Sequence, residues 1–225
     1  MNELREIISE SFYTHPLMLS SALLACILGI IHRKKFQELQ LIIFYPIASL
    51  IQGFIAYSSW ASMENEENLK ADVISESLFI LLEFLIVYDF FKKIIILNNL
   101  KKYIQIIFAF YIIYLLLMWL FTNSFYEHPI KVYLLESLCI LFFCFIYLIQ
   151  IFKLPPRLNL INDPPFWITI GCLFYFSCTI PLFFAQSTLK VFPQHGSLYS
   201  INFLAYTILF LFISKAFLCN PVPTK

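Results

Sequence analysis

Residues 130–152 read IKVYLLESLCILFFCFIYLIQIF, an almost unbroken apolar run in which charge is confined to Lys131 and Glu136. The run is long enough to supply the roughly 20 residues that an α-helix needs to cross the hydrocarbon core of a bilayer. Polar and apolar residues do not alternate along it, as they would in the strand of a membrane β-barrel. The stretch therefore predicts a transmembrane α-helix.

Six other stretches of the chain have the same character and a comparable length. Together with Ile130–Phe152 they predict one domain, residues 1–225, with an all-α membrane fold: a seven-transmembrane helix bundle. The first stretch is the shortest, and we expect its flanks to lengthen it or the bundle to enclose it. The six stretches are Pro16–Ile31, Leu39–Ser59, Ala71–Phe91, Tyr103–Phe121, Phe166–Ala185 and Ser197–Leu218.

The composition agrees with a chain that lies in lipid. Hydrophobic residues make up 60% of it and charged residues 13%, about half of the charged share that is usual in a soluble domain. A soluble fold this apolar would expose contiguous apolar surface and aggregate. The net charge of +1 leaves no basic face for phosphates, so we expect the lipid bilayer and no nucleic acid as a partner.

Basic residues are distributed unevenly between the loops on the two sides of the predicted bundle. One side has only Arg5, Lys70, Lys131 and Lys190. Short cytoplasmic loops carry the excess of Lys and Arg, so we expect the N-terminus outside and the C-terminus in the cytoplasm. The remaining eleven of the fifteen, on the expected cytoplasmic side, are Arg33, Lys34, Lys35, Lys92, Lys93, Lys101, Lys102, Lys153, Arg157, Lys215 and Lys225.

The chain also contains an internal duplication. Residues 11–16 read SFYTHP and residues 124–129 read SFYEHP, and the tripeptide Cys-Ile-Leu follows each at the same distance, at 26–28 and 139–141. Further on, Pro46 and Gly53 have the same spacing as Pro164 and Gly171. The order predicts a 3+1+3 parallel repeat, with repeat one at about 11–91, a linker helix at about 103–121 and repeat two at about 124–218. Parallel repeats of this kind occur in transporters, with binding sites at the repeat interface.

Several polar residues lie inside the predicted spans, where an ionisable group is costly and is a candidate for function. Glu76 and Glu83 stand seven positions apart, on one helix face, and Glu136 lies in the fifth span. Gln52 and Asn202 add uncharged polar groups in the second and seventh. We take these five as candidate ligand- or proton-binding residues. The alternative is that they hydrogen-bond to neighbouring helices and only hold the bundle together.

A metal site or a cofactor is not expected. His15, His128 and His195 precede three of the spans on the expected outer side, yet they lack the His-x-x-His spacing of metal sites and are only weak candidates. Lys215 invites comparison with a retinal-binding lysine, but it lies near the cytoplasmic end of its span, where a lysine extends to the interface. The six cysteines form no Cys-x-x-Cys pair, and catalytic motifs such as Gly-x-Ser-x-Gly are missing, so the sequence leans away from an enzyme.

One segment resembles a known group of proteins. Residues 163–168, DPPFWI, followed by Gly171 and by LFYF at 173–176, are similar to a pattern in small bacterial seven-helix membrane proteins. That group has no defined function, and its members are often encoded near sensor histidine kinases. The resemblance implies a multi-pass protein of a bacterial cytoplasmic membrane, with a separate signalling protein such as a histidine kinase as its partner. It transfers no site residue.

Three functions follow from these observations. The resemblance and the short tails favour a sensor-like, receptor-like or accessory protein that acts through its partner. The 3+1+3 layout resembles that of the SWEET sugar transporters, which makes a small-solute or proton-coupled transporter the alternative. The SWEET sequence motifs are missing, however, and the chain has only four glycines. An intramembrane lipid-modifying enzyme is third.

Overall fold

The computed structural model describes the backbone of residues 2–33, 37–61, 66–121, 130–153, 160–189 and 196–219, with side chains over most of these ranges. Within them the chain is helical throughout, with no strand, as the sequence predicts. Two short 3₁₀-helices, η1 (Gln37–Ile43) and η2 (Leu160–Asn162), precede α2 and α6. The α-helices are α1 (Asn2–His32), α2 (Phe44–Ala61), α3 (Glu66–Ile94), α4 (Asn98–Phe121), α5 (Ile130–Lys153), α6 (Pro164–Leu189) and α7 (Gly196–Leu218).

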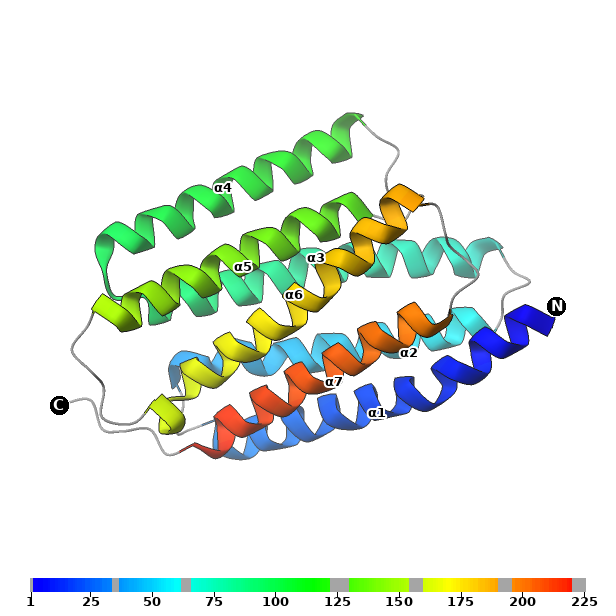
Figure 1. Ribbon diagram of the computed structural model, residues 1–225, viewed down its shortest axis with the longest axis horizontal. Helices are drawn as coiled ribbons and strands as arrows, with labels where there is room; N and C mark the ends of the chain where they lie inside the picture. The colour runs from blue at the N-terminus through cyan, green and yellow to red at the C-terminus, as the bar shows by residue number, and fades with distance from the viewer. Residues whose placement is uncertain are drawn as a thin grey trace.

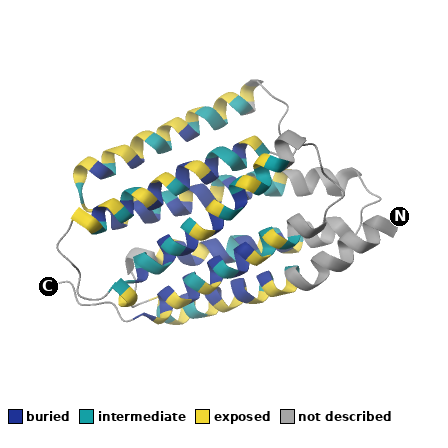
Figure 2. Ribbon diagram, in the orientation of Figure 1, coloured by how far each residue is buried: buried dark blue, intermediate teal, exposed yellow. Residues whose placement is uncertain are grey.

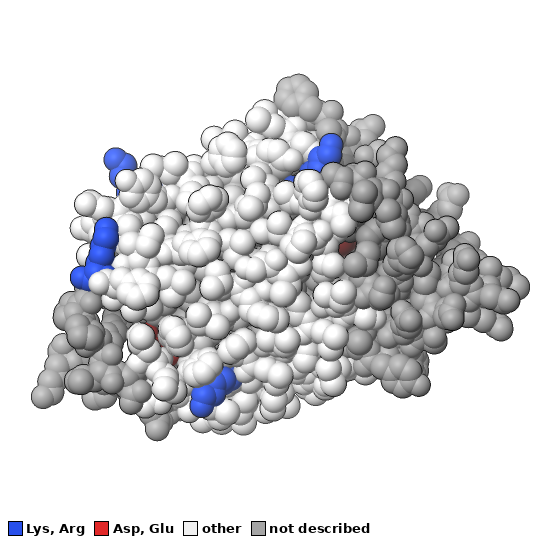
Figure 3. Space-filling view, viewed as in Figure 1, with Lys and Arg blue, Asp and Glu red and all other residues white. Residues whose placement is uncertain are grey.

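Five of these helices, α1, α4, α5, α6 and α7, are long and apolar enough to cross a membrane over their described residues. The apolar part of α2, Gln40–Ile55 with the end of η1, is shorter, and α3 carries several charged residues. On the face seen in Figure 3, charged side chains lie toward the two ends of the helices and the broad middle is uncharged. The protein is therefore a multi-pass membrane protein.

Six helices form a closed circuit of contacts, and the seventh lies outside it. Going round, α1 packs against α2, α2 against α3, α3 against α5, α5 against α6, α6 against α7, and α7 against α1. Helix α4 contacts only α3 and α5 extensively, and it lies along the outside of the bundle (Figure 1). Most of its length is exposed, as Figure 2 shows, so α4 covers the contact between α3 and α5.

The most extensive contact is that between α1 and α7. A Cβ atom added to Gly29 of α1 would lie 3.1 Å from Cε2 of Phe217 in α7 and 3.0 Å from Cγ1 of Ile43 in η1. Ala22 and Ala25 of α1 are fully buried as well. Small residues allow helix backbones to approach closely in lipid, where packing rather than the hydrophobic effect holds helices together.

The DPPFWI segment closes the connection between α5 and α6. Asp163 precedes the helix, and Pro164 occupies its first position, where the missing N–H costs nothing. The hydroxyl of Tyr147 in α5 donates to Oδ2 of Asp163 at 3.1 Å, which ties the start of α6 to α5. The indole Nε1 of Trp167 donates back to the carbonyl of Ile161 at 2.6 Å.

Trp167 also packs against the C-terminal half of α7. Its ring stacks on Phe212 with 5.8 Å between centroids, and the Nζ of Lys215 lies 5.9 Å from the centroid of the indole. Lys215 thus belongs to this corner of the bundle. The residues that carry the family resemblance therefore have local structural roles, in capping α6 and in joining α6 to α7.

A buried amide fastens the turn between α3 and α4 to α5. Gln150 of α5 accepts hydrogen bonds from the backbone N–H groups of Ile96 and Leu97, at 2.7 and 3.2 Å, and donates to the carbonyl of Ile94 at 3.1 Å. These backbone groups lie between two helices and have no partner within either. A single side chain satisfies three of them, so α4 is held beside α5 at this end.

The element bounds agree closely with the expected spans except at the first. Helix α1 begins at Asn2 and passes through Pro16, where the sequence predicts a start. Proline removes its own N–H bond and crowds the preceding turn, a cost that a long helix is able to absorb by bending. The short first stretch is thus lengthened by its N-terminal flank.

The glycines give a paired test of helix packing. A Cβ atom at Gly171 would lie 2.9 Å from Cβ of Phe212 and 3.5 Å from the carbonyl of Leu209, so Gly171→Ala must push α7 away from α6. We expect it to lower the free energy of unfolding by about 1–3 kcal/mol. A Cβ atom at Gly53 would meet side-chain ends alone, the closest being Cδ2 of Leu19 at 2.8 Å, so Gly53→Ala is the matched control and should cost less.

The measurement is the thermal unfolding midpoint of both variants in one detergent. An equal loss of stability in the two variants would contradict the close approach of α6 and α7 at Gly171.

Candidate functional site

Glu83 lies near the middle of α3 with no exposed surface. The hydroxyl of Tyr45 donates a short hydrogen bond to its Oε1 atom. Tyr45 stands in the first turn of α2, directly before Pro46, and is itself fully buried. The Oε2 atom of Glu83 is buried without a hydrogen-bond partner. Of the two oxygen atoms of the Glu83 carboxyl, one is thus held by α2 and the other is not.

Tyrosines from α6 and α7 enclose the same carboxyl. Tyr206 of α7 is buried, and its side chain lies within electrostatic range of Glu83. Its ring packs on Tyr175 of α6 with 4.2 Å between centroids and on Phe210 with 5.8 Å. The ring of Tyr45 approaches Phe210 from the other side, at 5.7 Å. Glu83 therefore lies among aromatic side chains contributed by three helices.

A second buried carboxyl comes from α5. Glu136 has no exposed surface, and neither of its carboxyl oxygens has a hydrogen-bond partner. It lies within electrostatic range of Glu83, across the contact between α3 and α5. Lys93 pairs with Asp89 at 2.7 Å, near the end of α3. No basic side chain in the part of the chain that the structure describes neutralises either glutamate.

Helix α4 contributes one residue to this region. Along its outer surface Ile106, Phe110 and Ile113 are exposed, whereas Tyr111 is fully buried. The ring of Tyr111 lies 3.9 Å, centroid to centroid, from Phe84, the residue after Glu83. Its hydroxyl has no hydrogen-bond partner and lies within electrostatic range of the Glu136 carboxyl. Tyr111 thus reaches from the covering helix into the contact between α3 and α5.

We call Glu83, Glu136, Tyr45, Tyr111 and Tyr206 the carboxyl–tyrosine cluster. An ionised carboxylate in an apolar interior is costly unless it is paired and hydrogen-bonded. Tyr45 donates to one oxygen of Glu83, whereas both oxygens of Glu136 lack a donor among the described residues. Buried polar groups without partners are rare, and each calls for an explanation. The cluster is therefore the candidate site.

The structure brings together two of the five candidates, Glu83 and Glu136. Gln52 accepts a hydrogen bond from the hydroxyl of Ser75 at 2.9 Å, which links α2 to α3. Glu76, the residue after Ser75, is partly buried two turns N-terminal to Glu83. Asn202 is partly buried one turn before Tyr206, and its Oδ1 atom has no hydrogen-bond partner.

Of the three histidines that are weak metal candidates, the structure describes His15. Its ring packs edge-on against Phe203 of α7, with 5.1 Å between centroids. His128 and His195 lie outside the residues that the structure describes. Among the side chains that are described, His, Cys, Asp and Glu gather nowhere in a group of three or more that could hold a metal ion.

Sequence reasoning overlooked Tyr45 and Tyr111. Tyrosine is common at membrane interfaces, and sequence alone does not distinguish such a residue from one that is buried deep in a span. A usable signal exists for Tyr111, which lies in the middle of α4, within its apolar part. A tyrosine at that depth needs a partner for its hydroxyl, and so it predicts a polar neighbour.

Comparison with known proteins assigns the chain to no family. No family model matches the chain, and neither a curated protein nor a solved structure matches it. The candidate site therefore depends on its own geometry.

The hydrogen bond from Tyr45 can be tested directly. Tyr45→Phe removes the donor to Oε1 of Glu83 and leaves Tyr206 as a hydroxyl within reach of the carboxyl. We expect the free energy of unfolding to fall by about 1.5–3 kcal/mol, the range for hydrogen bonds to groups that carry charge. Tyr103→Phe is the control, because Tyr103 of α4 is 59% exposed and should tolerate the change.

Unfolding of both variants would be followed in mixed micelles of increasing denaturing-detergent content. Equal stability of Tyr45→Phe and the wild type would show that Glu83 does not depend on this bond.

Proposed function

We propose that the chain is a sensor-like, receptor-like or accessory membrane protein that acts through a separate signalling protein in the same membrane. The carboxyl–tyrosine cluster is its responsive site, and α4 transmits the response. A histidine kinase is the class of partner that fits, in a bacterial cytoplasmic membrane.

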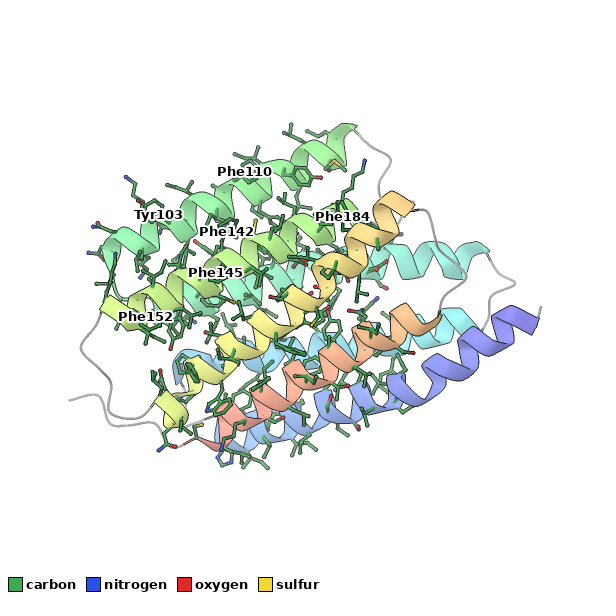
Figure 4. All side chains as sticks on the ribbon, viewed as in Figure 1. Tyr103, Phe110, Phe142, Phe145, Phe152 and Phe184 are labelled. Atoms are coloured by element: carbon green, nitrogen blue, oxygen red, sulfur yellow. The ribbon has the colours of Figure 1, made fainter. Side chains whose placement is uncertain are left out.

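One observation carries the proposal: the covering helix is both part of the site and the most exposed of the helices that are apolar enough to span the membrane. Tyr111 is buried within electrostatic range of Glu136, while the neighbouring Phe110 is 58% exposed. Exposed aromatic side chains of α4 and α5 project from this part of the bundle in Figure 4, among them Tyr103, Phe110, Phe142 and Phe145. A change at the carboxyls that moves Tyr111 would therefore move a surface that a second membrane protein is able to contact.

We further propose that the chain spans the membrane seven times, with its N-terminus outside and its C-terminus in the cytoplasm. Helices α1–α3 are then repeated as α5–α7. The helix contacts support the repeat, because each contact has a counterpart: α1 with α2 and α5 with α6, α2 with α3 and α6 with α7, α1 with α7 and α5 with α3. The uneven distribution of Lys and Arg between the loops supports the orientation.

Site-specific photo-crosslinking tests the role of α4. A photoreactive amino acid at Ile106, Phe110 or Ile113 faces outward in native membranes, and we expect an adduct with one signalling protein, identified by mass spectrometry. The matched positions are Leu24 and Ile27, which are exposed on α1 and should give lipid adducts alone. Lipid adducts from all five positions, with no protein partner from α4, would contradict the proposal.

A transporter is the second candidate, and the paired helix contacts favour it. Two halves related by parallel repetition are able to rock about a site at their interface. Glu83 and Glu136 lie at one of the two contacts between the halves, that of α3 with α5.

Flux of protons or small solutes into proteoliposomes distinguishes the two functions. A transporter requires flux by the purified protein that collapses in Glu83→Gln, whereas the sensor predicts none in either protein. Substrate flux by the wild type would overturn the sensor proposal.

A further inference from the structure

The carboxyl–tyrosine cluster contains several buried oxygen atoms without hydrogen-bond partners. There are five: Oε2 of Glu83, both carboxyl oxygens of Glu136, and the hydroxyl oxygens of Tyr111 and Tyr206. They come from four helices, α3, α5, α4 and α7. A shared proton links only two oxygens, so one proton does not partner the whole set.

Two carboxyl groups share the environment of these oxygens, and no basic side chain of the described residues pairs with either. Glu83 and Glu136 lie within electrostatic range of each other, and no Lys, Arg or His of the described residues forms an ion pair with them. The side chains that surround them are Tyr45, Tyr175 and Tyr206, which carry no positive charge.

Tyr111 is an observation independent of the two acids. It belongs to a helix that otherwise lies outside the bundle, it is fully buried, and its hydroxyl, within electrostatic range of both carboxyls, lacks a partner. A tyrosine that served only to fill space would be replaced by phenylalanine without loss. Its hydroxyl is a third kind of oxygen within electrostatic range of the two carboxyls.

We infer that Glu136, Glu83 and Tyr111 form a binding site for one monovalent metal cation of the Na⁺ class, located beneath α4. Carboxylate and hydroxyl oxygens suit hard cations. Divalent cations fit less well, because Ca²⁺ takes about 6–8 oxygen ligands and Mg²⁺ usually keeps several waters. The inference rests on the proposed function, and it names the ligand class of the responsive site.

The test is the thermal unfolding midpoint of the purified protein, with NaCl exchanged for choline chloride at constant ionic strength. A ligand that binds the folded protein alone stabilises it in proportion to the logarithm of its concentration above the dissociation constant. We expect the midpoint of the wild type to rise saturably with Na⁺. Glu136→Gln should abolish this rise, and Tyr111→Phe should shift it to several-fold higher Na⁺.

Glu76→Gln is the matched control, since Glu76 is on α3 but outside the cluster, and it should keep the response to Na⁺. Equilibrium binding of radioactive ²²Na⁺ to Tyr111→Phe, which retains both carboxyls, provides a second readout if Glu136→Gln does not fold. An unfolding midpoint that does not change with Na⁺, or that changes with pH alone, would overturn the cation site. Protonation of the two carboxyls would then explain their burial.

These outcomes are independent of the crosslinking test. A signalling partner at α4 without a response to Na⁺ overturns the cation site alone, and a response to Na⁺ without a partner overturns the proposed function alone.

Discussion

The burial of two carboxyl groups without a counter-charge is the constraint on which this bundle depends. Each helix that packs near Glu83 or Glu136 contributes a hydroxyl group or an aromatic face there, and in the described residues none contributes a base. Burying an isolated charge in an apolar interior costs far more free energy than a typical hydrogen bond contributes to stability. Such an arrangement persists at a functional site more readily than in a passive scaffold.

The contact of α1 with α7 and that of α3 with α5 differ in a way that fits this constraint. Helices α1 and α7 approach closely at Gly29, where small residues line the contact. Helices α3 and α5 contact each other less extensively, carry the two carboxyls, and are covered by α4. The helices therefore pack more extensively at α1 and α7 than at α3 and α5. Helix movement is easier at α3 and α5, which is where the buried carboxyls lie.

Much of the fold follows from hydrophobic length alone, which is why the bounds expected for α4, α5 and α7 agree with the structure to within a few residues. The burial of Glu83 and Glu136 follows from the cost of charge in lipid. The participation of Tyr111 does not, because it depends on the rotation of α4 against its neighbours. The role of Gln150 could not be predicted either, because its three partners are backbone groups of a turn that is distant in the sequence.

The central claim is that Glu83 and Glu136 act as one unit across the contact between α3 and α5. A double-mutant cycle measures this most directly, with unfolding free energies for the wild type, Glu83→Gln, Glu136→Gln and the double variant. The account predicts a coupling energy of about 0.5–3 kcal/mol, as for residues in one electrostatic network. Additivity within about 0.3–0.5 kcal/mol, the behaviour of independent sites, would contradict it.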